Sequence, residues 1–115
     1  MSDFVPTPAD EYPVVCDQEL ELPSGAKVIV RRPSMFLMVR RGQIPAEARE
    51  VVERMGRKEE VSEADQFVVL DCLVAASFVS PKVSLKRKKG CVCIDDMPDD
   101  DRLAVIKALD LKKVI

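Results

Sequence analysis

Alternating polar and apolar residues near the start of the chain predict a β-hairpin. Glutamate and leucine alternate over residues 19–22, and a Val-Ile-Val run lies between basic residues at 27–31. The intervening sequence Pro-Ser-Gly-Ala, residues 23–26, is typical of a turn. Residues 1–17, by contrast, carry prolines among scattered acids and follow neither the strand period nor the helix period, which indicates an irregular arm.

Two helices are predicted after the hairpin. Ser34 can cap a short helix over residues 35–39, which ends at two arginines and Gly42. The second helix begins at Pro45, because proline suits the first helical turn, and ends at Gly56. One face of it is charged, and the other carries apolar residues at helical spacing, namely Ala48, Val51, Val52 and Met55.

The longest apolar stretch predicts a helix at the centre of the core. It follows a capping sequence at Ser62, is apolar nearly all round from Phe67, and is terminated by Pro81. A short β-like run at residues 91–94 and a last helix with an acidic first turn follow. We therefore expect an α+β fold, mostly α, with an N-terminal β-hairpin followed by about four helices. The arm precedes one small globular domain, residues 18–115.

The composition argues against catalysis. The 115 residues include no histidine, which is the most common general acid or base and a frequent metal ligand. We therefore expect a protein that binds another protein, and not an enzyme. The formal charge of -2 gives no chain-wide attraction to nucleic acid or membranes. The few aromatic residues are expected in the core: Phe4, Tyr12, Phe36, Phe67 and Phe78.

No cofactor or metal is expected at the cysteines or at the acidic run. The chain opens without an export leader, so the thiols are expected to be free and to fill the core as small apolar groups. The alternative is a zinc site in which Cys91 and Cys93 are joined by Cys16 and Cys72. The aspartates within residues 95–101 lack the glycine and the closing glutamate of a calcium loop, so a helix N-terminus explains them better.

Neither a membrane nor a nucleic acid is expected as a partner. The apolar stretch at residues 67–79 is shorter than the roughly 20 residues of a membrane-spanning helix. The basic run at residues 86–89 could form a phosphate-binding face with arginines elsewhere, but a solvated loop is the preferred interpretation. Those arginines are Arg31, Arg32, Arg40 and Arg41.

The order of several short motifs resembles that of one protein family. They are Leu22-Pro23-Ser24-Gly25, the strand at 28–30, a short apolar helix that closes with Arg41-Gly42-Gln43-Ile44-Pro45, the segment 79–83 after the long helix, and the segment 94–102 before the last one. In this order, over about residues 18–110, they resemble the tail assembly chaperones of long-tailed, non-contractile (siphovirus-type) bacteriophages, especially those infecting actinobacteria.

The resemblance implies a function in viral tail assembly. Such a protein binds the tape measure protein, keeps that long helical protein soluble and helps recruit tail tube protein subunits. It acts in the host cell cytoplasm and is absent from the mature virion. The family has no catalytic residues to carry over. Ribosomal frameshifting commonly yields a longer form, and Lys112-Lys113, or else Lys88-Lys89, could be encoded by a slippery site. Lysines that complement a helix dipole are the alternative explanation.

A chaperone of this kind needs exposed apolar side chains for its client. Met35, Phe36, Leu37 and Met38 are the candidate client-binding residues, because methionine repacks easily and this short helix has more apolar residues than one face can bury. The alternative is that they fill the core under the hairpin. Two other functions stay open, a small nucleic-acid-binding phage regulator and a structural tail or head-completion subunit. A homo-oligomer is also left open.

Overall fold

The computed structural model describes residues 4–113, and it confirms the α+β, mostly helical class with an N-terminal hairpin and about four helices. The strands and α-helices follow in the order β1 (Gln18–Glu21), β2 (Lys27–Val30), α1 (Met35–Arg40), α2 (Ala46–Gly56), α3 (Glu63–Ser77), β3 (Phe78–Ser80), β4 (Val83–Ser84), β5 (Val92–Cys93) and α4 (Asp99–Ala108). Single 3-10 turns occupy Ala9–Glu11, Ile94–Asp96 and Leu111–Lys113.

The predicted hairpin is present, and a third strand extends it. β1 and β2 pair antiparallel, with Leu20 opposite Val28, and β3 adds to the other side of β2. The expectation that the long helix runs to Pro81 is therefore wrong, because α3 ends at Ser77 and the chain continues as β3. The backbone N–H of Arg31, directly after β2, donates to the carbonyl of Ser77 at 2.7 Å. This hydrogen bond starts the pairing of the chain with β2 at the residue where the helix ends.

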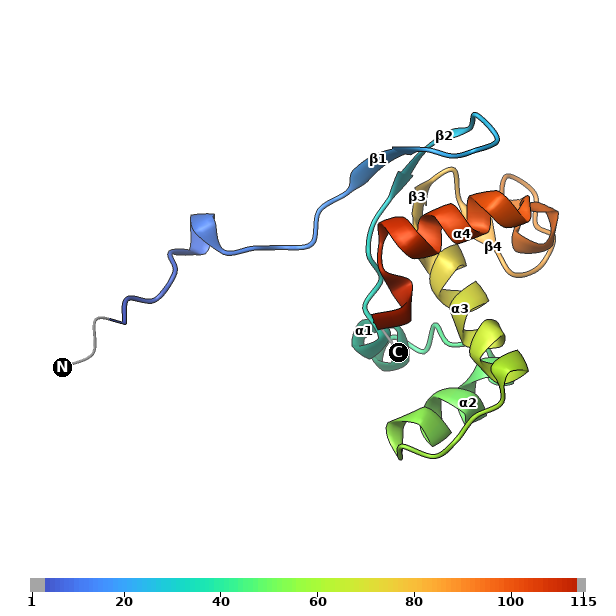
Figure 1. The fold of residues 1–115 in the computed structure, drawn as a ribbon, viewed down its shortest axis with the longest axis horizontal. Coiled ribbons are helices and arrows are strands. Elements are labelled where there is room, and N and C mark those ends of the chain that lie inside the picture. The colour runs from blue at the N-terminus through green and yellow to red at the C-terminus, as the bar shows by residue number, and fades with distance from the viewer. Residues whose placement is uncertain (1–3, 114–115) are drawn as a thin grey trace.

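The helix α3 forms the centre of the core, as predicted. Its Val69, Leu73 and Val74 are at most 1% exposed. In Figure 1, α4 crosses α3 near one end, α2 lies beside its other end, and the hairpin covers the far side of α4. The buried side chains that these neighbours and the turn at Leu111–Lys113 contribute are mostly aliphatic, among them Val28, Val30, Ala48, Val51, Val105 and Leu111.

The acidic run lies at a helix N-terminus, as predicted. Asp99, Asp100 and Asp101 occupy the first turn of α4, where carboxylates complement the helix dipole. Asp101 is only 4% exposed, and its carboxylate accepts hydrogen bonds from the backbone N–H and the hydroxyl of Ser24 in the hairpin turn. This contact fixes the tip of the hairpin to α4.

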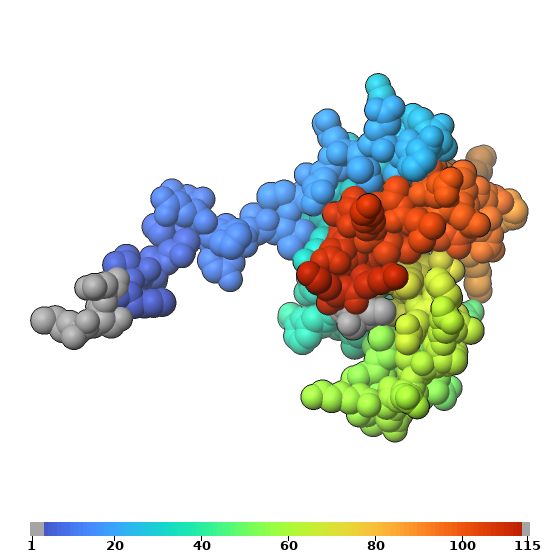
Figure 2. All heavy atoms as spheres, in the orientation of Figure 1, coloured from blue at the N-terminus to red at the C-terminus, as the bar shows by residue number. Residues whose placement is uncertain are grey.

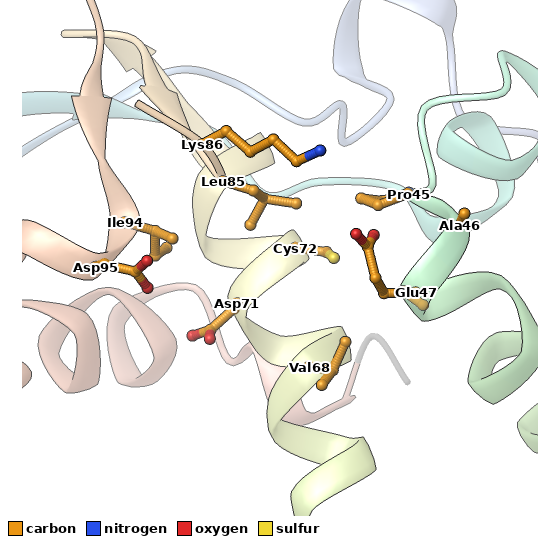
Figure 3. Close-up of a pocket in the computed structure, with 11 residues that line it drawn as sticks. Pro45, Ala46, Glu47, Val68, Asp71, Cys72, Leu85, Lys86, Ile94 and Asp95 are labelled. Carbon is orange, nitrogen blue, oxygen red and sulfur yellow. The ribbon is translucent and has the colours of Figure 1, made fainter. Parts of the chain in front are cut away.

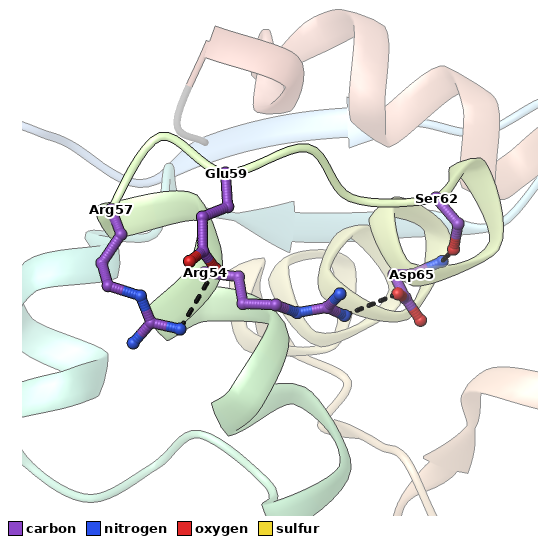
Figure 4. A network of polar contacts seen from close by, with 5 residues as sticks. All are labelled: Arg54, Arg57, Glu59, Ser62 and Asp65. Carbon is purple, nitrogen blue, oxygen red and sulfur yellow. Dashed lines mark hydrogen bonds and ion pairs between the residues drawn. The ribbon is translucent and has the colours of Figure 1, made fainter.

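A polar network joins α2 to α3 (Figure 4). The Arg54 guanidinium bonds to the Asp65 carboxylate at 2.8 Å, and the Ser62 hydroxyl accepts a hydrogen bond from the backbone N–H of Asp65 at 3.1 Å, which confirms the predicted cap. In the loop between the two helices, Arg57 donates to Glu59 at 3.1 Å, and this hydrogen bond raises the pKa of the Arg57 guanidinium. The Arg54–Asp65 pair thus links the last turn of α2 to the first turn of α3.

Candidate client-binding surface

The helix α1 presents apolar side chains to solvent. It begins where the Ser34 hydroxyl accepts a hydrogen bond from the backbone N–H of Leu37 at 3.2 Å, as predicted for a cap. Phe36 is 74% exposed, Leu37 is 38% exposed and Val39 is 54% exposed. Phe36 and Arg40 are four residues apart and therefore lie on the same face of the helix.

The structure divides the candidate client-binding residues into two groups. Phe36 and Leu37 are exposed, whereas Met38 is 5% exposed in the core and Met35 is half-buried against it. Met38 is therefore not accessible to a client, and its place in the candidate surface is corrected. A helix with 3.6 residues per turn cannot expose all of four consecutive residues when one side rests on a core. The exposed residue that the sequence reasoning left out is Val39.

The N-terminal arm carries a second group of exposed apolar side chains. Figure 2 shows the arm as a thin extension that leaves the domain near β1. Its exposed apolar side chains are Phe4, Val5, Tyr12, Val14 and Val15. The base of the arm is attached through Arg31, whose guanidinium donates to the carbonyl of Val15 at 3.1 Å and lies 3.9 Å from the Asp17 carboxylate.

The expectation that the aromatic residues fill the core is wrong for four of the five. Phe78 alone is buried, at 5% exposed, whereas Phe4, Tyr12, Phe36 and Phe67 are each more than half exposed. Aliphatic side chains from α3 and its neighbours already fill the interior. The exposed aromatics lie on the arm, on α1 and in the first turns of α3, which contribute few residues to that interior.

A third group of exposed apolar side chains is a pair between α3 and α4, which the sequence analysis did not predict. Phe67 is 55% exposed and Leu103 is 59% exposed, and both line a small groove of about 310 Å³. Arg102, which lines the same groove, pairs with Asp71 at 3.2 Å. The sequence did not indicate that these residues are exposed. The stretch that forms α3 is apolar on all sides, so its pattern does not show which turn the neighbouring elements leave uncovered.

A larger groove of about 750 Å³ lies between α2, α3 and the segment that follows β4 (Figure 3). Glu47 points into it from α2, the thiol of Cys72 faces it from α3, and Leu85 from the segment after β4 also lines it. Burial, together with the nearby carboxylates of Asp71 and Glu47, raises the pKa of the Cys72 thiol to about 11. That thiol therefore stays protonated at neutral pH and is a poor nucleophile or metal ligand.

The cysteines occupy different environments and are free. Cys72 and Cys93 are buried, as expected for small apolar groups, but Cys91 is half-buried and Cys16 is exposed on the arm. The expectation of core packing is therefore wrong for Cys16, because the arm that carries it leaves the domain. Among residues 4–113, no three cysteine, aspartate or glutamate side chains converge in a way that could hold a metal ion.

The fold does not bring the basic groups of the sequence together. The loop between β4 and β5 carries the run at residues 86–89, and Figure 1 shows it on the opposite side of the domain from α1 and its arginines. Arg87 in that loop forms two hydrogen bonds with Asp96, at 2.7 and 2.9 Å, which raise the pKa of its guanidinium. A single phosphate-binding face built from both groups is therefore not present.

Compared with known protein families, with characterised proteins and with solved structures, the chain matches none. Within residues 4–113, no helix is long and apolar enough to cross a membrane.

Proposed function

We propose that this protein is a bacteriophage tail assembly chaperone that binds the tape measure protein and keeps it soluble. The observation that carries the proposal is the exposure of apolar side chains on two parts of the chain, α1 and the N-terminal arm. Phe36, Leu37 and Val39 lie exposed on α1, and apolar side chains such as Tyr12 and Val14 lie exposed on the arm. Apolar side chains held in water provide a surface for an apolar client.

The geometry of this surface suits a helical client. A helix with an apolar stripe binds by placing side chains three and four residues apart against apolar partners. The rigid part of such a site is α1, whose inner side is anchored in the core by Met38. The arm supplies an extended apolar segment that can follow a client of variable shape. The motif order described above supports the same family, and tail tube subunits are the further partners that it implies.

The proposal also places the protein in the host cytoplasm during assembly and outside the finished virion. An assembly chaperone that is absent from the finished virion must release its client before assembly is complete. A surface of a few exposed apolar side chains favours such release, because it buries less area than the large apolar interfaces of permanent complexes.

Co-expression with the tape measure protein tests the proposal. We expect the wild-type chain to raise the soluble fraction of the tape measure protein, and its gene to lie just upstream of the very long reading frame that encodes this client. An unrelated soluble protein of similar size serves as the control. If the client stays equally insoluble with and without the chain, and purified particles contain the protein, a structural tail subunit is the better explanation.

A further inference from the structure

Charge is divided sharply between the arm and the segment around α1. Residues 4–17 contain Asp10, Glu11 and Asp17 and no basic residue. Residues 31–41 contain four arginines and no acid. The whole chain is nearly neutral, with a formal charge of -2, so this division is local. Opposite charge on two surfaces steers their association and fixes how they meet.

Two acids of the arm and two arginines at the end of α1 are available to form ion pairs. Asp10 and Glu11 are exposed in the arm, and Arg40 and Arg41 are exposed at the end of α1. Among residues 4–113, no ion pair within 4.0 Å joins any of these four side chains to another. Arg31 differs from them, because it is already engaged with Asp17 at the base of the arm.

Each charged segment also carries exposed apolar side chains. Tyr12 and Val14, next to the arm's acids, are 63% and 68% exposed. Phe36 and Leu37, within one turn of Arg40, are 74% and 38% exposed. The two surfaces thus match in both respects, with apolar side chains beside charges of opposite sign. A contact between them would remove apolar area from water and pair the free charges.

The course of the arm favours a contact with another molecule. The radius of gyration is 16.3 Å, against about 13 Å for a compact domain of this size. The longest dimension is 57 Å, and Figure 1 shows the arm pointing away from α1 of its own chain. The bonds from Arg31 to Val15 and Asp17 hold its base in that direction. Residues 4–14 can span roughly 35 Å beyond this base, enough to reach a neighbouring molecule.

We propose that the arm of one copy docks on α1 of a second copy. Asp10 and Glu11 of the first copy lie against Arg40 and Arg41 of the second, and the aromatic side chain of Tyr12 packs beside Phe36. Each copy has one arm and one α1, so two copies that exchange arms form a closed pair with both contacts made. The contact needs no client and does not rest on the proposed function.

Charge reversal in two separate chains tests this contact. The first variant, D10K/E11K, has a basic arm and a basic α1, and the second, R40E/R41E, has an acidic arm and an acidic α1. We expect the wild-type chain to associate in sedimentation velocity, and each variant alone to associate at least roughly tenfold more weakly. An equimolar mixture of the two variants regains the association, because each arm then meets an α1 of opposite charge.

The controls separate this contact from other effects. Reversal of the exposed acids Glu60 and Glu63 in E60K/E63K changes the net charge as much as D10K/E11K does, and we expect it to leave association unchanged. Association of the wild-type chain should weaken as salt rises from 50 to 500 mM, because screening shortens the range of these charges. The proposal is overturned if the wild-type chain is monomeric. It is also overturned if the mixed variants remain monomeric while one chain that carries all four reversals associates as the wild type does. The latter result would place the arm on its own α1.

Discussion

Ser24 donates two hydrogen bonds to the carboxylate of Asp101, one from its backbone N–H at 2.9 Å and one from its hydroxyl at 2.5 Å. The two residues are 77 positions apart and join the hairpin turn to the first turn of α4. The turn itself is closed by the Gly25 backbone N–H, which donates to the Leu22 carbonyl at 2.8 Å, and Gly25 has a φ of +92° that favours glycine. The hairpin is thus fixed at its tip as well as along its strands.

Removal of the Asp101 carboxylate should loosen the hairpin. In D101A, the two hydrogen bonds from Ser24 to a charged and buried carboxylate are lost, so we expect the free energy of unfolding to fall by about 1–3 kcal/mol. The matched control is D100A, because Asp100 is exposed in the same helical turn, and its change should stay within about 0.5 kcal/mol. Urea unfolding followed by circular dichroism measures both. Equal losses in the two variants would mean that helix-dipole complementarity, and not the bond to Ser24, accounts for the effect.

The environment of Cys72 predicts both its reactivity and a dependence of stability on pH. Its pKa is raised to about 11 by burial and nearby carboxylates, so the folded chain keeps this thiol protonated. In the unfolded chain this thiol ionises around its ordinary pKa of 9.0. Above that pH the unfolded state binds fewer protons, and the free energy of unfolding should fall between about pH 9 and pH 11.

Two measurements check this thiol. At pH 8, a thiol reagent should modify the exposed Cys16 rapidly and Cys72 only upon unfolding. In C72A, the loss of stability between pH 9 and pH 11 should be smaller than in the wild type. Rapid modification of Cys72 in the folded protein would show that the large groove opens more than the structure indicates.

DNA binding should be negligible at physiological salt. The basic loop at residues 86–89 is short, and Arg87 within it is paired with Asp96 of the acidic run. A gel shift at 150 mM salt should therefore show no complex at micromolar protein. Binding below 1 μM that falls steeply with salt and is lost when residues 86–89 are neutralised would favour the nucleic-acid-binding regulator instead.

The frameshift site is expected at Lys112-Lys113. α4 ends at Ala108, and the lysine pair lies in the following 3-10 turn, Leu111–Lys113. A change of reading frame there leaves α4 intact in both products. The nucleotide sequence should contain a slippery heptamer at these codons and an overlapping minus-one frame that stays open, and mass spectrometry of infected cells should detect the fused peptide. Absence of the heptamer would exclude this site.

Local signals in the sequence were sufficient for most of the fold. The turn around Gly25 and the caps at Ser34 and Ser62 are set by residues close together in the chain, and all three were predicted. β3 was missed because a continuous apolar run is compatible with either a helix or a strand. The pairing of Phe78 with Val30 on β2, more than 40 positions earlier, decides between the two, and no local pattern records it.

The candidate surface was harder to predict for a related reason. The apolar residues of α1 are consecutive, so the sequence has no clear polar face that shows which side of the helix is buried. It therefore could not show that Met38 faces the core and Val39 faces solvent. The orientation of α1 depends on how the helix packs on the core, into which Met38 is buried. The exposure of Phe67 and Leu103 likewise depends on how far α3 and α4 overlap, which is a tertiary property.

The most direct test of the account is a binding titration between the purified chain and a helical segment of the tape measure protein. We expect saturable binding that weakens at least roughly tenfold in F36S/V39S, because both side chains are exposed on α1 and two apolar anchors are lost. The matched control, F67S/L103S, removes exposed apolar side chains on α3 and α4 and should bind as the wild type does. Unchanged binding by a folded F36S/V39S protein, or binding lost equally in the control, would contradict the assignment of the client to α1.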